Sequence, residues 1–166
     1  MPSSPDVPAA VITVSDRCHA GTQEDRSGPL ARDLLASEGL VAGDVVVVPD
    51  EVDAIQGALR SALEAGARFV LTTGGTGVGP RDVTPEAVAP LLALDLPGVA
   101  EQVRAHGLAA TPHAVISRGV VGLTDRGERA ALVATAPGST GGVRDTVAVV
   151  APLVRHVLGQ AAGAAH

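Results

Sequence analysis

Three short runs of apolar, mostly β-branched residues, separated by segments with helical spacing, constrain the fold more than any other feature. The runs are Ala9–Val14, Val45–Val48 and Phe69–Thr72. Between the second and third runs, apolar residues recur at every third or fourth position from Glu51 to Ala65, as one face of a helix requires. Repeated strand–helix–strand units place their strands parallel in one sheet. The sequence therefore predicts a three-layer α/β/α sandwich around a mostly parallel, doubly wound sheet.

The rest of the chain predicts further elements around this sheet. Helices are expected to begin near Ser27 and at Thr84, with Thr84 as the cap of the second one. In the C-terminal half we expect a helix over Val99–His106 after a break at Pro97, a strand over Ala114–Ser117, a hairpin of Val120–Thr124 and Ala130–Thr135, and a long helix after Ser139. The hairpin gives the sheet a mixed edge.

The chain has 166 residues, which is typical of one domain. We expect a single domain over 1–166 with an ordered core at about 9–158. A chain of this length buries roughly 70% of its unfolded surface, which suffices for a core. Because the sequence has one Phe and no Trp or Tyr, Val, Leu, Ile and Ala must fill that core.

Charge and composition disfavour several classes of function. The formal net charge is -6 and the sequence has no run of basic residues, so binding that tracks nucleic-acid phosphates is not expected. No stretch approaches about 18 uncharged apolar residues, so no membrane span is expected. The segment Met1–Pro8 lacks the pattern of a signal peptide, and the single cysteine, Cys18, is compatible with a reducing compartment. These features predict a cytoplasmic protein.

Small and acidic residues follow the predicted strands at the points where the strands end. Because the carboxyl ends of parallel strands share one edge of a sheet, these residues are expected to converge where such folds bind ligands. They are Ser15, Asp16 and Arg17 after the first strand, Asp50 after the second, Thr73–Gly77 and Asp82 after the third, and Gly138 and Ser139 after the last. Turns are rich in Gly, Asp and Ser for conformational reasons alone, but four such loops at one edge favour a binding site.

The glycine-rich segment LTTGGTGVGPRDVTPEA, at 71–87, fits neither of the usual phosphate motifs. A dinucleotide fingerprint starting at Gly75 fails because Pro80 occupies its third glycine position. A Walker loop starting at Gly74 lacks the lysine and hydroxyl that must follow its second glycine. The segment still offers backbone N–H groups to phosphate oxygens, since glycine allows close approach and positive φ.

Without a Walker lysine, the charge of a bound phosphate must be neutralised in another way. Asp50 and Asp82 supply carboxylate oxygens, the ligands that Mg²⁺ prefers. The sequence therefore predicts Mg²⁺ held by these two carboxylates and bridging the phosphate oxygens of a nucleotide. Arg81, beside Asp82, is either a cation that steers a triphosphate or a solvated loop residue.

Other interpretations of individual residues stay open or are disfavoured. Asp50 and Asp82 each precede a predicted helix, so each side chain can instead be a helix cap. Cys18 and His19 have the residue types of a nucleophile–base pair, but adjacent residues rarely face each other. The other histidines lack metal-ligand spacing, which disfavours a protein-only zinc site.

An ordered set of motifs resembles the MoaB/Mog family of molybdenum cofactor biosynthesis proteins. In chain order the motifs are VSDR, DRSGP, PDE, TTGGTG, PRDVTPEA, PGVAEQVR and APGST. The resemblance runs from Val11 to about Leu158, and the ordered set is far more specific than the glycine motif alone. The same fold recurs in gephyrin-like, MoeA-like and CinA-like proteins.

This resemblance implies a molybdopterin adenylyltransferase, which converts molybdopterin and MgATP to adenylyl-molybdopterin and pyrophosphate. Asp50 and Asp82 match the acidic residues that the family uses with the metal and the reacting phosphates. The residues that match its substrate and nucleotide loops are Asp16, Arg17, Thr73, Gly74, Gly75, Thr76, Gly77, Pro137, Gly138 and Ser139. Further candidates for the same site are Arg81, Glu101, Ser117, Arg118 and Arg144. The resemblance also implies a homotrimer and a MoeA-like partner that inserts molybdate.

The second phosphate loop departs from the family pattern. Where the family often has Pro-Gly-Ser-x-Lys, this chain has Gly141 in place of the lysine, and Arg144 is the nearest cation. One alternative is therefore a non-catalytic molybdopterin-binding or scaffold trimer of the MoaB branch. A CinA-like nucleotide hydrolase is disfavoured because the sequence shows no companion domain.

Overall fold

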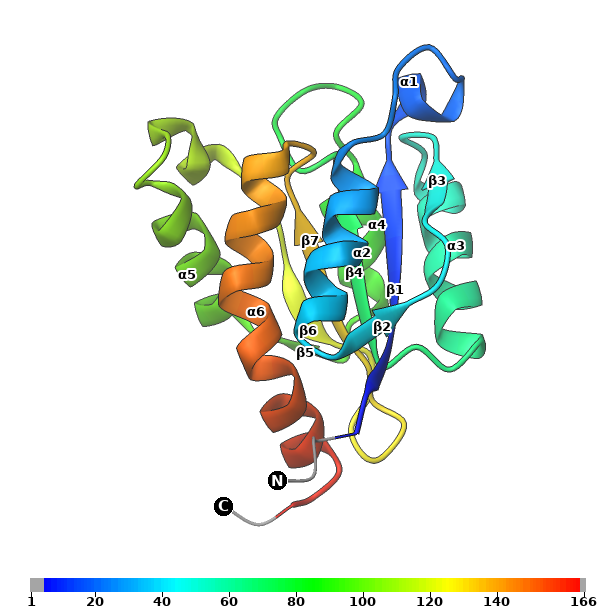
Figure 1. Cartoon of the computed structure of the whole chain (residues 1–166), viewed down its shortest axis with the longest axis vertical. Helices are drawn as coiled ribbons and strands as arrows, with labels where there is room; N and C mark the ends of the chain where they lie inside the picture. Colours follow the sequence, from blue (N-terminus) through cyan, green and yellow to red (C-terminus); the bar gives the residue numbers. More distant parts are fainter. Residues whose placement is uncertain (1–4, 165–166) are drawn as a thin grey trace.

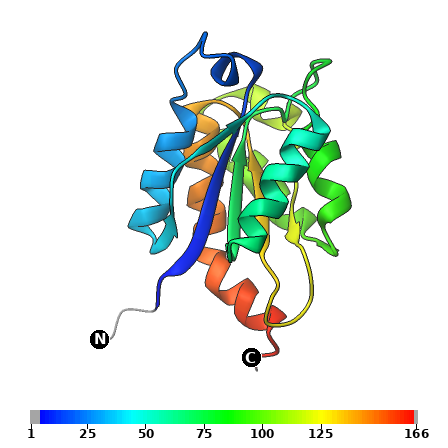
Figure 2. The same cartoon turned by 90° about the vertical axis from the view of Figure 1, so that its right-hand side faces the viewer.

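The computed structural model describes residues 5–164 and forms one seven-stranded sheet between two layers of helices (Figure 1, Figure 2). The strands are β1 (Val7–Val14), β2 (Leu40–Ala42), β3 (Val46–Val48), β4 (Phe69–Thr73), β5 (Leu94–Asp95), β6 (Val121–Leu123) and β7 (Leu132–Ala136). Their order is β2-β1-β4-β7-β6-β5, with β3 also paired to β1. β1, β2, β3, β4 and β7 are parallel, whereas β6 and β5 form an antiparallel edge.

Helices cover both faces of the sheet. They are α1 (Asp16–His19), α2 (Ser27–Ser37), α3 (Val52–Glu64), α4 (Thr84–Val88), α5 (Pro97–Gly107) and α6 (Thr140–Ala161), with 3₁₀ turns η1 (Ala89–Leu91) and η2 (Pro112–Ile116). Figure 2 shows α2 and α6 on one side of the sheet and α3 and α4 on the other. The predicted three-layer, mostly parallel sandwich with a mixed edge is thus confirmed.

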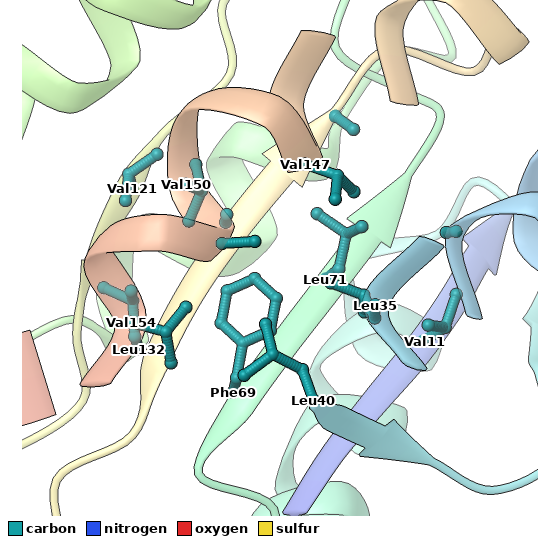
Figure 3. Packing of buried hydrophobic residues seen from close by; sticks show 14 of the residues in the cluster. Val11, Leu35, Leu40, Phe69, Leu71, Val121, Leu132, Val147, Val150 and Val154 are labelled. Carbon is teal, nitrogen blue, oxygen red and sulfur yellow. The ribbon is translucent and has the colours of Figure 1, made fainter. Parts of the chain in front are cut away.

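The central strands are buried on both faces, which is why their sequences are apolar runs rather than alternating patterns. Val11 and Phe69 join the cluster under α2 and α6, whereas the next residues, Ile12 and Val70, join the cluster under α3 and α4. Phe69, the sole aromatic residue, is 1% exposed and sits among aliphatic side chains in Figure 3. Aliphatic packing therefore builds both halves of the core, as the composition predicts.

Two predicted elements are wrong in detail. Ala114–Ser117 was expected as a strand, but its first three residues belong to η2 and Ser117 is the C-cap, because the Thr111 hydroxyl accepts the backbone N–H of His113 and Pro112 starts the turn. Pro97 was expected to end a segment, but it is the first residue of α5, where its missing N–H costs nothing. Both errors come from local capping, which outweighs the weak strand or break signal of a short segment.

The remaining differences concern short elements and the ends of the chain. β2, β5 and α1, which have two to four residues each, were not predicted. Regular structure begins at Val7 in β1 and continues to Ala161 in α6, slightly beyond the expected 9–158. Within residues 5–164, no helix is both long and apolar enough to cross a membrane.

Candidate active site

The loops at the carboxyl ends of β1, β3, β4 and β7 surround a cavity of about 1260 Å³. It lies at the end of the molecule that carries α1 in Figure 1, between α1 and the side bearing α5 and η2. The predicted site residues that line it are Asp16, Arg17, Asp50, Thr73, Gly74, Gly75, Thr76, Gly77, Asp82, Ser117, Pro137, Gly138 and Ser139. The structure thus brings together loops that lie far apart in the sequence.

Four of the further candidates do not line this cavity: Arg81, Glu101, Arg118 and Arg144. Glu101 and Arg144 are exposed on α5 and α6. Arg81 pairs with Asp16, and Arg118 binds the backbone behind the glycine loop. A direct ligand contact has no support in this geometry for any of the four.

Asp16 and Asp50 fasten the ends of β1 and β3 to each other. The backbone N–H of Asp16 donates to Oδ2 of Asp50 at 2.8 Å, and the N–H of Asp50 donates to Oδ1 of Asp16 at 3.0 Å. Arg81 then binds both oxygens of Asp16, each at 3.0 Å. The hydrogen bond from Arg81 lowers the pKa of the Asp16 carboxyl, so Asp16 is anionic with its own counter-ion. These bonds fix the orientation of Asp50.

Asp50 is in a different electrostatic position. Burial raises the pKa of the Asp50 carboxyl, and the like charges of Asp16 and Asp82 act in the same direction. Arg81, whose charge acts to lower the pKa of Asp50, is already paired with Asp16. Oδ1 of Asp50 lies toward Gly75, where an added Cβ would come within 3.2 Å of it. A cation at this place would relieve the charge on Asp50.

Asp82 is held by its own loop. Its Oδ2 accepts the backbone N–H of Gly79 at 2.8 Å, and its N–H donates to the Gly79 carbonyl at 3.1 Å. An added Cβ on Gly77 would come within 2.8 Å of the same Oδ2, so the loop backbone packs directly on the carboxylate. Glycine is required where backbone comes this close to a side chain.

The capping interpretation fails for both aspartates. Helix α3 has Glu51 at its N-cap and α4 has Val83, and neither helix has a side-chain cap. Asp50 binds Asp16 and Asp82 binds Gly79 instead. Neither carboxylate caps the helix that follows it in the sequence.

Thr84 was expected to cap α4, but it is a helical residue that ties the glycine loop down. It is fully buried, and its Oγ1 donates to the Gly74 carbonyl at 2.8 Å. Its N–H donates to the Gly75 carbonyl at 3.1 Å. The glycine loop is therefore bonded to α4 through two successive carbonyls.

We expect Thr84→Val to destabilise the protein by roughly 1–2 kcal/mol, because it keeps the side-chain shape but leaves the buried Gly74 carbonyl without its hydroxyl donor. Thermal unfolding followed by circular dichroism measures this loss. Thr22→Val is the matched control: the Thr22 hydroxyl donates to Arg17 on an exposed surface, so the change should stay within about 0.5 kcal/mol. Equal effects in the two variants would contradict the role of Thr84.

The start of α6 forms the opposite wall. Ser139 is its N-cap and accepts the Gly142 N–H at 3.0 Å, at the helix start that the sequence predicts. Thr73 Oγ1 donates to the Pro137 carbonyl at 2.9 Å, which ties this loop to the end of β4. The first N–H groups of a helix have no partner within the helix and favour anions. The α6 start therefore suits a phosphate.

Asp25 is one of several residues of the cavity wall that were not predicted from the sequence. Asp25 lines the cavity, accepts the Thr13 hydroxyl at 2.7 Å and accepts the Gly28 N–H at 2.9 Å. It fixes the start of α2 against β1. Asp25 lies in the quoted motif DRSGP, so the signal was present but was not assigned to a residue.

The geometry gives no support to a Cys18–His19 nucleophile–base pair or to a zinc site made by the described residues alone. The His19 ring lies 3.3 Å from the Val47 carbonyl oxygen, and no bond joins it to Cys18. Among residues 5–164, no three His, Cys, Asp or Glu side chains gather as a metal-binding group. A metal at Asp50 and Asp82 would therefore need oxygen ligands from substrate or water to complete its coordination.

Comparisons with known proteins agree on one family. The family model described as a probable molybdopterin binding domain matches residues 10–156. The molybdopterin adenylyltransferase of Pyrococcus furiosus is 36% identical over 149 residues, covering 89% of this chain and 87% of that protein. A molybdenum cofactor biosynthesis bifunctional protein of Synechococcus elongatus is 40% identical over 95% of this chain. The chain spans only 48% of that relative's length.

Solved structures give the same result. A molybdopterin biosynthesis protein from Mycobacterium abscessus has a TM-score of 0.85 and 42% identity, covering 94% of this chain and 96% of its own. The tungsten cofactor synthesizing protein MoaB from Pyrococcus furiosus has a TM-score of 0.88 and 34% identity. The match covers 96% of this chain and 99% of the MoaB chain. With the family model matched over most of its length, the chain belongs to the MoaB/Mog family of molybdenum cofactor biosynthesis proteins.

Proposed function

We propose that this protein transfers the adenylyl group of ATP to molybdopterin in a Mg²⁺-dependent reaction that releases pyrophosphate. The observation that carries the proposal is the convergence of two carboxylates, Asp50 and Asp82, with a glycine-rich loop and a helix start on one cavity. The Pyrococcus relative named molybdopterin adenylyltransferase supports the choice of substrates.

The cavity has the size and the donors for two anionic substrates. Its volume of about 1260 Å³ exceeds the range of about 300–1,000 Å³ that is usual for a single small ligand. The glycine loop lies on one side and the α6 start, capped by Ser139, on the other. Backbone N–H groups from both sides would bind phosphate oxygens without a lysine.

The donor set at Asp50 and Asp82 fits Mg²⁺. Both are carboxylates, the hard oxygen ligands that Mg²⁺ prefers, and Mg²⁺ usually takes one or two of them together with substrate phosphates. The raised pKa of Asp50, caused first by burial, marks a carboxylate whose charge lacks compensation. When bound, Mg²⁺ would supply charge neutralisation at the phosphate oxygens.

The chain itself contributes position and charge. In the proposed reaction an oxygen of the molybdopterin phosphate forms a bond to the α-phosphorus of ATP, and the bond from that phosphorus to pyrophosphate breaks. Reactions of this kind depend mainly on alignment and electrostatic stabilisation. Asp50 and Asp82 would orient the reacting phosphates from one side through the Mg²⁺ that they hold. The glycine loop and the helix start at Ser139 would bind phosphate oxygens on the other side.

Two measurements test this proposal. Calorimetry should show tighter binding of ATP with Mg²⁺ than with EDTA, because only the metal joins the two carboxylates to the phosphates. Equal affinities in the two buffers would contradict the metal site. Pyrophosphate release should require ATP, Mg²⁺ and molybdopterin together.

One observation favours a second candidate, a non-catalytic molybdopterin-binding or scaffold protein. Gly141 stands where a lysine is often found, and Arg144 does not line the cavity, so it does not replace that charge. A purified protein that binds molybdopterin but releases no pyrophosphate would establish this alternative. The homotrimer, the MoeA-like partner and the cytoplasmic location stay predictions of the resemblance and composition under either function.

A further inference from the structure

Arg118 makes an unusual number of bonds to one loop. Its Nε donates to the Gly77 carbonyl at 2.8 Å and its Nη2 donates to the Asp82 carbonyl at 2.8 Å. Its own backbone N–H donates to the Thr76 carbonyl at 2.8 Å, and its Nη1 pairs with Glu86 on α4. One side chain therefore bridges both ends of the segment 77–82 and anchors them to a helix.

Apart from the ion pair of Arg81 with Asp16, the segment between these ends has little other support. Val78 is 74% exposed, and Gly79, Pro80 and Arg81 are exposed as well. The bond from the Gly79 N–H to Asp82 Oδ2 joins the segment to itself rather than to the core. The orientation of the Asp82 carboxylate thus depends on the Arg81–Asp16 pair and on what holds the two ends of the segment.

We propose that Arg118 is a positioning residue, which holds the segment 77–82 closed and thereby keeps the Asp82 carboxylate directed at the cavity. Arg118 does not line the cavity, so it acts through the loop rather than on a ligand. The inference rests on the proposed function, because it assigns the reason why Asp82 must be held.

The geometry requires an arginine and not merely a positive charge. A guanidinium group has donors in a fixed planar fork, so it serves two carbonyls and a carboxylate at once. A lysine keeps the charge, but its single ammonium group cannot reach the Gly77 carbonyl, the Asp82 carbonyl and Glu86 in the same geometry.

The ion pair with Glu86 attaches the guanidinium group of Arg118 to α4. The hydrogen bond from Arg118 lowers the pKa of the Glu86 carboxyl, and the pKa of Arg118 is raised in return. Both groups therefore stay charged across the neutral range. Because the pair is partly exposed, its main contribution is orientation of the guanidinium rather than stability.

The test compares Arg118→Lys with Arg60→Lys in the full chain. Arg60 is an exposed arginine on α3 that binds Gln56 and lies outside the cavity, so it controls for the chemical change. The measurements are the rate of pyrophosphate release at several Mg²⁺ concentrations, the thermal midpoint, and, without any ligand, hydrogen exchange of the hydrogen-bonded 77–82 amides, those of Gly79 and Asp82. Glu86→Gln, which removes the charge but keeps hydrogen bonding, is expected to have a smaller effect than Arg118→Lys.

We expect Arg118→Lys to lower turnover about tenfold and to raise the Mg²⁺ concentration needed for half-maximal rate, as changes behind a metal ligand do. Exchange of the 77–82 amides should become about tenfold faster. Arg60→Lys should match the wild type in turnover, in thermal midpoint and in amide exchange. Wild-type turnover in Arg118→Lys would overturn the inference. A rate loss that follows a lowered thermal midpoint, with unchanged Mg²⁺ dependence, would also overturn it.

Failure of the proposed function gives a different result. An inactive wild type would refute adenylyl transfer but would leave the exchange measurement intact. Unchanged exchange of the 77–82 amides in Arg118→Lys would then overturn the positioning role by itself, and faster exchange would support it.

Discussion

We expect Asp82→Asn to lower the rate of the proposed adenylyl transfer by at least about 100-fold, or about 2.7 kcal/mol at the transition state. Both proposed substrates are anionic, the glycine loop lacks a lysine, and Arg81 is bound to Asp16. In the proposed reaction, Asp50 and Asp82 are therefore the groups that would hold a metal at the reacting phosphates. The measurement is pyrophosphate release under saturating ATP and molybdopterin.

The fold should survive this substitution. The Asn side-chain oxygen can accept the Gly79 N–H that Asp82 Oδ2 accepts in the wild type at 2.8 Å. The thermal midpoint should then change by no more than a surface substitution does, about 0.5 kcal/mol in stability. Lost turnover with a collapsed midpoint would show that Asp82 is structural, and near wild-type turnover would refute its catalytic role.

We expect Asp50→Asn to impair turnover to an extent similar to that of Asp82→Asn. Burial raises the pKa of the Asp50 carboxyl in the folded state, so its ionised form opposes folding above that pKa. The variant should consequently be as stable as the wild type, or more stable, at neutral pH. As the pH falls through the folded pKa the wild-type carboxyl protonates, and the difference in thermal midpoint should shrink.

The sequence predicted the layers of this fold because the signals involved are long. The helix at Val52–Glu64 shows about three turns of apolar spacing, and the apolar runs of β1 and β4 are buried on both faces. η2 escaped prediction because a Thr-Pro cap decides it, against the apolar character of Ala114–Ser117. A strand as short as β5 forms only where a neighbouring strand, here β6, provides the partner.

In the candidate site, too, some features could be predicted from the sequence and others could not. Convergence of the loops at one edge follows from parallel topology, so Asp16, Asp50 and Ser139 were placed correctly at the cavity. Pairings across the fold could not be predicted, since nothing in the spacing of Arg118 and Glu86 indicates that they meet. Arg81 shows the limit most clearly: its sequence context allows either a phosphate contact or a solvated loop residue, but its guanidinium binds Asp16 in the structure.

The second large effect concerns Gly74, where we expect Gly74→Ala to destabilise the protein by at least about 3 kcal/mol. An added Cβ would lie 2.1 Å from the carbonyl oxygen of Val14, and φ is +105°, which side-chain-bearing residues rarely adopt. Relief by backbone movement is blocked. The Gly74 N–H donates to the Ala136 carbonyl at 2.9 Å, and its own carbonyl accepts the Thr84 hydroxyl.

For a chain of this length the expected loss corresponds to a fall of roughly 6–12 °C in the thermal midpoint. Gly57→Ala is the matched control, since Gly57 is exposed on α3 and an added Cβ meets nothing within 4 Å. Alanine in an exposed helix is favoured over glycine, so this variant should gain about 0.5–1 kcal/mol. Because the two variants make the same chemical change, opposite signs isolate the close contact of Gly74 with β1. A midpoint for Gly74→Ala near that of the wild type would mean that the glycine loop can move away from Val14. The glycine loop would then not be a rigid set of backbone N–H groups for phosphate oxygens.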